Sequence, residues 1–278
     1  MVAFDKFSGQ FIDAIKMGIA AKVTNDSRNA LFWQKLNDGY RGPRVLVEGD
    51  SWVCYPDKLV TGGPRDLISH MSSKFAIATQ AQPGDLVANM VDTLHAEGGI
   101  LKAITVYKPD VLVVSGGGND LLGAGRLATF LNPGKHALPD YFRVSYDSHF
   151  WTIIDGIKTI ARAALRTKPA LKIVVHGYAY TAPLPGGPWL QAPMDRLDIP
   201  QRDREPIIRR MVDQFNEALI QLSGQINREG EGSRVFHADL RRRVAKNRWF
   251  DEIHPTTEGF SSAASGLATA IRRAYRSP

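Results

Sequence analysis

The sequence predicts an α/β fold of three layers, in which a five-stranded parallel sheet lies between helices on both of its faces. Short, largely apolar runs recur along the chain, and such runs are typical of strands that are buried on both faces. Longer segments with apolar residues at helical spacing separate these runs. Because parallel strands need long crossovers, this alternation indicates strand–helix units that form one sheet.

Five runs are the expected strands of this sheet. The clearest are Arg-Val-Leu-Val-Glu at 44–48 and the valine-rich run at 111–115. The other three runs are 75–79, 172–176 and 234–238. All five are short, as strands of a globular domain usually are.

Helices are expected from the apolar stripes at 86–94, 150–165, 207–222 and 260–271. In the third of them we expect Asp203 to cap the N-terminus and Pro206 to lie in the first turn. Residues 1–278 are expected to be a single domain, with 1–40 as a helical N-terminal extension packed on it. The apolar residues that recur at helical spacing in this extension are Phe4, Phe7, Phe11, Ile12, Ile15 and Ile19.

Composition limits the class of protein. The 278 residues suffice for one sizeable domain, and 44% apolar with 23% charged residues is ordinary for a globular chain. The single cysteine, Cys54, excludes an internal disulfide framework and a cysteine-based zinc cluster. The sequence contains no apolar run long enough for a transmembrane helix, and its N-terminus lacks the features of a signal peptide. We therefore expect a cytoplasmic protein, provided that the sequence is the full gene product.

The formal net charge of +7 favours anionic partners in general terms. Arginine clusters at 209–210, 241–243 and 272–273 are interpreted as solvated helix faces and loops. No zinc-finger spacing or basic-region heptad accompanies them, so nucleic-acid binding is not predicted. The sequence gives no indication of an oligomeric state.

Residues with catalytic potential follow the predicted strands. Ser51 follows the first strand in a Gly-Asp-Ser turn, Gly84 follows the second, and Asn119 follows the third after three glycines. Asp251 and His254 follow the fifth strand after a loop, just before the last helix. Because functional residues collect beyond the carboxyl ends of parallel strands, we expect these residues to converge at one edge of the sheet.

This set of residues suits nucleophilic attack on an ester. A serine hydroxyl needs a base to take its proton, and His254 is the expected base for Ser51. Asp251, three residues before the histidine, can hold the imidazole in one tautomer. The backbone N–H groups of Ser51 and Gly84 and the side-chain amide of Asn119 are the expected oxyanion donors.

In their order along the chain, these motifs resemble the four blocks of the SGNH, or GDSL-type, hydrolase superfamily. Ser51 lies in the Gly-Asp-Ser block, Gly84 matches the glycine of the second block and Asn119 lies in the Gly-x-Asn-Asp block. Asp251 and His254 match the Asp-x-x-His block. The resemblance implies a flavodoxin-like α/β/α fold and a serine hydrolase of esters, thioesters or acetylated sugars that needs no metal. No other cofactor is expected.

Two positions depart from the pattern of the superfamily. Trp52 replaces the leucine that usually follows the Gly-Asp-Ser block, and it is expected to reshape the acyl pocket. The second block lacks the asparagine expected ahead of Gly84 and offers Gln80 and Gln82 instead.

Alternative interpretations stay open at this level. His176 and His237 also end predicted strands at the same edge, and His237 with Asp239 imitates a base–carboxylate pair. We favour His254 because it lies in the motif. An acyltransferase would use the same triad and acyl-enzyme, and a non-catalytic binding module could use the same scaffold.

The substrate is expected to be a small-molecule, saccharide or lipid ester, and the sequence does not choose among short-acyl, lipid and O-acetyl-sugar esters. The loops at 55–66, 122–140 and 178–204 are expected to line the cleft and to set specificity. Within and beside them, Trp52, Tyr178 and Trp189 are the expected substrate-binding residues, since their rings suit an acyl chain or a sugar ring.

Overall fold

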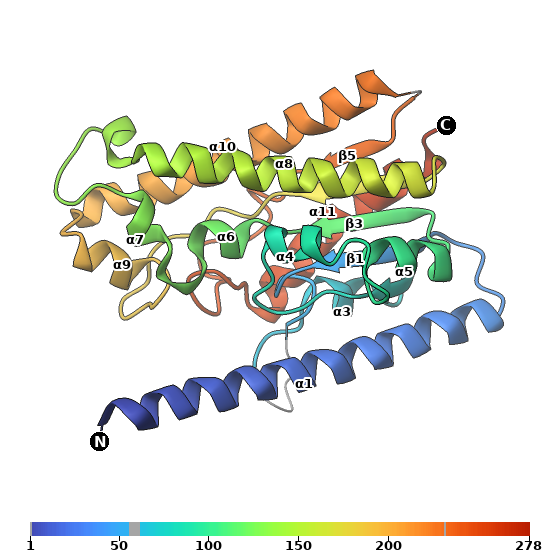
Figure 1. The fold of residues 1–278 in the computed structure, drawn as a ribbon, viewed down its shortest axis with the longest axis horizontal. Coiled ribbons are helices and arrows are strands. Elements are labelled where there is room, and N and C mark those ends of the chain that lie inside the picture. The colour runs from blue at the N-terminus through green and yellow to red at the C-terminus, as the bar shows by residue number, and fades with distance from the viewer. Residues whose placement is uncertain (1, 56–61, 231) are drawn as a thin grey trace.

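The described part of the computed structural model, residues 2–55, 62–230 and 232–278, forms one parallel sheet of five strands (Figure 1). The strand order is β2-β1-β3-β4-β5. The strands are β1 (Arg44–Gly49), β2 (Ala76–Thr79), β3 (Val111–Ser115), β4 (Lys172–His176) and β5 (Val235–Ala238). The predicted fold class is confirmed, and no predicted strand limit differs from the observed one by more than a residue.

The helices between the strands vary widely in length. They are α1 (Val2–Asn37), α3 (Leu67–Met71), α4 (Val87–Asp92), α5 (Ile100–Tyr107), α6 (Gly118–Leu122), α7 (Leu127–Phe130), α8 (Val144–Thr167), α9 (Gln191–Arg196), α10 (Gln201–Glu229) and α11 (Thr257–Arg276). The four stripes predicted as helices correspond to α4, α8, α10 and α11. The short helices α3, α6, α7 and α9 carry too few residues to show a periodic pattern.

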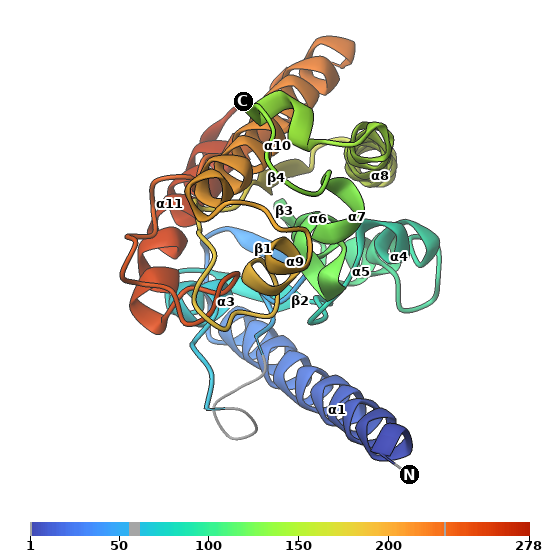
Figure 2. The same cartoon turned by 90° about the vertical axis from the view of Figure 1, so that its left-hand side faces the viewer.

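Helices pack on both faces of the sheet (Figure 2). Leu46 and Leu112 point into a core with α4, α5, α8 and α10, whereas Val47 and Val113 point into a second core with α3 and α11. This alternation follows from the two-residue period of a strand. It explains why consecutive residues in the middle of the strands are apolar, as in Val45, Leu46 and Val47 of β1.

α10 begins earlier than the sequence predicted. The helix starts at Gln201 with Pro200 at its N-cap, so the prediction that Asp203 caps it is wrong. Asp203 lies in the first turn, where a carboxylate favours the helix dipole, and accepts a hydrogen bond of 2.8 Å from the hydroxyl of Tyr141. Pro206 lies inside the helix, beyond its first turn.

α1 lies along the edge of the sheet formed by β2, and its N-terminal part projects past the α/β body (Figures 1 and 2). The side-chain amide of Asn29 accepts from the N–H of Thr79 at 2.8 Å and donates to its carbonyl at 3.1 Å. A neighbouring strand would use the same two backbone groups, so this side chain covers the open edge of the sheet.

The side chains predicted as an apolar stripe from Phe4 to Ile15 lie outside the described part of the chain. Among the described helices, none has the length and apolar character that a membrane span requires.

Candidate active site

The predicted site residues gather at the carboxyl edge of the sheet. Ser51 follows β1, Gly84 follows β2 and Asn119 lies in α6, directly after β3. Asp251 and His254 lie in the segment between β5 and α11. All five line one cleft. The tertiary structure therefore brings together the residues predicted for the triad and for the oxyanion donors.

The turn that carries the serine depends on a glycine. A Cβ at Gly49 would lie 2.4 Å from the carbonyl oxygen of Ser115, because β1 and β3 are paired there. No larger residue fits at this close approach of two strands. The N–H of Asp50 donates to the same carbonyl at 3.1 Å, and the N–H of Val53 donates to the carbonyl of Asp50 at 3.1 Å. These bonds close a tight turn around Ser51.

The buried carboxylate of Asp50 holds this turn in place through hydrogen bonds. Its Oδ1 accepts hydrogen bonds of 3.0 Å from the N–H of Trp52 and the hydroxyl of Ser115, and its Oδ2 accepts from the hydroxyl of Tyr178. Burial raises the pKa of Asp50 to about 6, although these three hydrogen bonds oppose the shift. Asp50 thus positions Ser51 through the backbone.

The hydroxyl, imidazole and carboxylate form a continuous chain of hydrogen bonds. Oγ of Ser51 lies 2.8 Å from Nε2 of His254, and Nδ1 of His254 lies 2.8 Å from Oδ2 of Asp251. An ionised carboxylate only accepts, so Nδ1 carries the proton in the neutral ring and Nε2 is left to accept from the serine. This tautomer is the one that a general base for Ser51 requires.

Asp251 is held in its ionised form by its neighbours. Its Oδ1 accepts from the backbone N–H groups of Ile253 and His254 at 2.8 and 2.7 Å. Burial by itself would raise the pKa of Asp251, but the hydrogen bonds from the His254 ring and from these two N–H groups outweigh it and lower the pKa. The negative charge can therefore stabilise an imidazolium.

Aromatic side chains hold the histidine segment against the serine turn. The indole N–H of Trp52 donates to the carbonyl of Ile253 at 3.0 Å. The ring of Tyr55 packs edge-on against the ring of His254, with centroids 4.8 Å apart. The residue after the nucleophile is thus a structural link between two segments of the triad, which the sequence did not indicate.

Asn119 and Gly84 lie on neighbouring segments of the cleft. Nδ2 of Asn119 donates to the carbonyl of Asp85 at 3.0 Å, which ties α6 to the turn that contains Gly84. Gly84 has a φ of 77°, a left-handed conformation that favours glycine. One N–H of the Asn119 side-chain amide donates to the carbonyl of Asp85, and the same amide has a second N–H that can act as a donor.

Two cavities of very different size meet at the serine. A narrow pocket of about 30 Å³ lies against Trp52, Tyr178 and Val212, and a wide cleft of roughly 950 Å³ lies between α1 and Trp189. Ser51, Asn119, Ile253 and His254 line both. One small and one large space thus adjoin the hydroxyl of Ser51.

The predicted substrate-binding residues divide between these cavities. Trp52 and Tyr178 line the narrow pocket, and Trp189 lines the wide cleft. The polar atoms of Trp52 and Tyr178 already bond to the protein, so these rings offer mainly apolar surface to a ligand. Each of the three predicted specificity loops contributes a described residue to a lining: Tyr55 lines the wide cleft, and Leu122 and Tyr178 line the narrow pocket. Residues 56–61 of the first loop lie outside the described part.

Glu252, between the two predicted triad residues, has a structural role that sequence reasoning missed. Its side chain is 1% exposed, and its carboxylate accepts from four backbone N–H groups of one loop. The donors are Leu184, Trp189, Leu190 and Gln191, at 2.7 to 3.0 Å. A Cβ at Gly187 would lie 2.0 Å from the Glu252 carboxyl carbon, so the loop closes around the carboxylate. No local pattern marks such a residue, because its partners lie more than sixty positions away.

The two alternative histidines bond to groups other than the serine. Nε2 of His237 lies 3.1 Å from Oδ1 of Asn216, and Nδ1 of His176 lies 3.0 Å from the carbonyl oxygen of Gly177. Burial lowers the pKa of both histidines to about 4. In the described part of the chain neither ring lines the narrow pocket or the wide cleft.

The sequence profile of the GDSL-like lipase/acylhydrolase family matches residues 37–261 of the chain. The chain belongs to this family. It is thus a member of the GDSL/SGNH hydrolases, as the four motif blocks predicted. No curated protein sequence is significantly similar to it.

Solved structures show the same fold at low sequence identity. A family 3 carbohydrate esterase from Clostridium thermocellum superposes with a TM-score of 0.52 at 13% identity, over 85% of this chain and 98% of that one. An extracellular lipase from Streptomyces rimosus gives a TM-score of 0.52 at 14% identity, over 82% and 100%. A salicylyl-acyltransferase from a tetracycline biosynthetic pathway gives 0.52 at 12% identity, over 85% and 56%. At such identities the likeness establishes the fold and leaves the substrate open.

Proposed function

We propose that this GDSL-type hydrolase cleaves carboxylic esters through an acyl-enzyme on Ser51, with His254 as general base and acid and Asp251 as its orienting carboxylate. The observation that carries the proposal is the pair of 2.8 Å contacts that link Ser51, His254 and Asp251. This arrangement supplies the nucleophile, base and orienting group of an acyl-transfer site.

In the first half-reaction the Ser51 oxygen bonds to the ester carbonyl carbon while its proton passes to Nε2 of His254. The carbonyl π electrons move to the oxygen, which becomes an oxyanion. When the tetrahedral intermediate collapses, the bond from carbon to the alcohol oxygen breaks, and the His254 proton passes to that oxygen. The acyl group is then an ester of Ser51.

In the second half-reaction water is the nucleophile and Ser51 is the leaving group. His254 takes a proton from water as the water oxygen bonds to the acyl carbon, and it returns that proton to Oγ of Ser51 as the serine ester breaks. In both halves the oxyanion needs preorganised donors. We assign this role to the amide of Asn119 and the backbone N–H groups of Ser51 and Gly84.

The experiment is release of p-nitrophenol from p-nitrophenyl acetate. Wild-type protein is expected to release it with saturable kinetics and to be labelled by a fluorophosphonate on Ser51. Ser51→Ala should lose both properties, whereas Ser265→Ala, an exposed serine in α11, should keep them. Equal rates for wild type and Ser51→Ala refute the proposal. Formation of a new ester when an alcohol is added identifies transfer as the favoured outcome of the same acyl-enzyme.

A further inference from the structure

The narrow pocket has room for a short acyl group. Its volume of about 30 Å³ corresponds to roughly two water molecules by the usual measure of one per 10–15 Å³. Trp52, Ala179 and Thr181, which line it, are buried, and Val212 of α10 forms part of its wall. A chain of more than a few carbons would have to displace these side chains.

The wide cleft is more than an order of magnitude larger and reaches exposed residues. Gly18 and Lys22 of α1 line one side of it, and Trp189 and Ile253 lie on another. Lys22 forms an ion pair of 2.8 Å with Asp26, which also lines the cleft. The lining therefore combines hydrogen-bonding groups with an aromatic ring, a combination that suits a bulky polar ligand.

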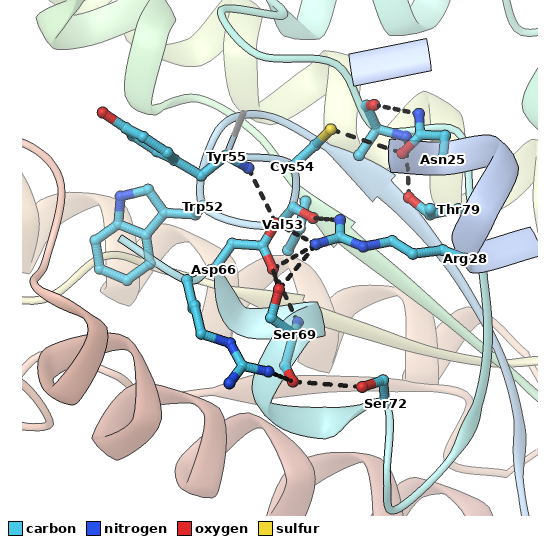
Figure 3. A network of polar contacts seen from close by, with 12 residues as sticks. Asn25, Arg28, Trp52, Val53, Cys54, Tyr55, Asp66, Ser69, Ser72 and Thr79 are labelled. Carbon is cyan, nitrogen blue, oxygen red and sulfur yellow. Dashed lines mark hydrogen bonds and ion pairs between the residues drawn. The ribbon is translucent and has the colours of Figure 1, made fainter. Parts of the chain in front are cut away.

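α1 is held firmly enough to serve as a wall (Figure 3). Nη2 of Arg28 donates to both carboxylate oxygens of the buried Asp66, and Nη1 donates to the carbonyl of Val53 at 3.0 Å. Nδ2 of Asn25 donates to the carbonyl of Ala81 at 2.8 Å. These bonds join α1 to the segment after Ser51 and to the segment after β2, and both of these segments border the cleft.

We infer that the substrate is an ester of a short acyl group and a bulky polar alcohol, with the acyl group in the narrow pocket and the alcohol against α1. The inference rests on the proposed function. The alcohol must leave and water must enter while the acyl group stays bound to Ser51. The alcohol therefore belongs in the larger cleft, whose lining includes exposed residues such as Lys22, and the acyl group in the small pocket, whose lining residues are buried or half-buried. α1 is then a substrate-binding element for the alcohol.

Gly18 permits a direct test of the α1 wall. A Cβ built at Gly18 meets no atom within 4 Å, so Gly18→Trp places an indole in the cleft without a backbone clash. Ser27→Trp is the matched control, because Ser27 is exposed in α1, lies on the opposite face of the helix from Gly18 and is outside the cleft lining. The measurement is kcat/KM for glucose pentaacetate and for ethyl acetate. Gly18→Trp should lower the ratio of the first to the second by about ten-fold or more, as steric exclusion from a binding site does. Ser27→Trp should leave the ratio at its wild-type value.

Substitutions of Val212 test whether the acyl group lies in the narrow pocket, since a smaller side chain enlarges this pocket and a larger one narrows it. Val212→Ala enlarges the narrow pocket and should raise the ratio of kcat/KM for p-nitrophenyl butyrate to that for the acetate by about ten-fold. Val212→Leu should lower the same ratio. Circular dichroism and thermal unfolding check that each variant is folded before its ratio is interpreted.

The outcomes separate this inference from the proposed function. If wild type hydrolyses esters and Ser51→Ala does not, but Gly18→Trp and Ser27→Trp give equal ratios, the inference is overturned and the proposed function stands. If Gly18→Trp discriminates by acyl length instead of alcohol size, the assignment of the two cavities is reversed and the inference is again overturned. Wild-type protein that hydrolyses none of these esters overturns both proposals.

Discussion

Nη2 of Arg28 in α1 lies 2.8 and 2.7 Å from the two carboxylate oxygens of Asp66 (Figure 3). Asp66 caps α3 by accepting from the N–H of Ser69 at 2.9 Å, and it also accepts from the N–H of Tyr55 at 3.0 Å. The ring of Tyr55 in turn packs against His254. One ion pair thus joins α1, α3 and the segment that follows the candidate nucleophile.

Arg28→Met should destabilise the protein strongly, because it leaves the buried Asp66 carboxylate without its cation. We expect the free energy of unfolding to fall by about 3–5 kcal/mol. The control is Arg162→Met, which removes an exposed ion pair with Glu229 and should leave the free energy of unfolding close to the wild-type value. Urea unfolding followed by circular dichroism measures both values. Equal losses for the two variants would contradict the prediction.

Glu252→Gln should loosen the loop that carries Trp189. The side-chain amide keeps one acceptor oxygen and turns two hydrogens toward backbone N–H groups that need an acceptor. Because a buried donor without a partner costs about 1–3 kcal/mol, we expect the free energy of unfolding to fall by about 2–4 kcal/mol. Glu258→Gln changes an exposed carboxylate in α11 and serves as the control. A Glu252→Gln protein as stable as the control would show that the loop does not depend on the second carboxylate oxygen.

Asn119→Ala should affect turnover more than substrate binding, because an oxyanion exists only after attack. Loss of one such donor lowers kcat by about 10²–10³-fold. The matched control is Asn89→Ala, since Nδ2 of Asn89 also bonds to Asp85, at 3.0 Å from its Oδ1, on an exposed surface. Steady-state kinetics on p-nitrophenyl acetate distinguish the two. A comparable loss of kcat in both variants would point to the Asp85 turn instead of the oxyanion.

Glu48 at the end of β1 gives the fold an expected pH dependence. Burial, together with the negative charge of Asp85, raises the pKa of Glu48 from 4.5 to about 8, although the N–H of Gly49 donates to its carboxylate. A raised pKa means that the folded state binds a proton that the unfolded state has lost. The stability that Glu48 contributes is therefore fully present below pH 4.5 and is lost as the pH rises through about 8.

Glu48→Gln should remove this dependence while keeping the shape of the side chain. Asp50, with a pKa of about 6, and His176 and His237, with pKa values of about 4, act at lower pH. The raised pKa values of Cys54 and Tyr55, about 12, lie above this range. Between pH 6.5 and 8 the wild type should lose about 1–2 kcal/mol more of its free energy of unfolding than Glu48→Gln does. Urea unfolding at four pH values measures the difference. Parallel curves for the two proteins would refute the assignment.

The limits of sequence reasoning follow from the range of the interactions. Strand limits were predictable because burial on both faces makes consecutive positions apolar, as at 111–114 and 173–175. The role of Asp203 was not predictable, because the group that it bonds to, the hydroxyl of Tyr141, lies sixty-two residues away in the sequence. Helices of four to six residues, such as α7 and α9, gave no periodic signal.

By itself, the sequence determined the fold class, the family and the residues that follow each strand, since strand burial and short motifs are encoded by neighbouring positions. The tertiary structure alone decided the strand order and the 2.8 Å approach of Ser51 to His254 across 203 positions. It also decided the hydrogen bonds from a distant loop to the Glu252 carboxylate, and the ion pair between Arg28 and Asp66 that holds α1 in place. Each of these depends on packing that brings remote segments together, and no local pattern of residues records that packing.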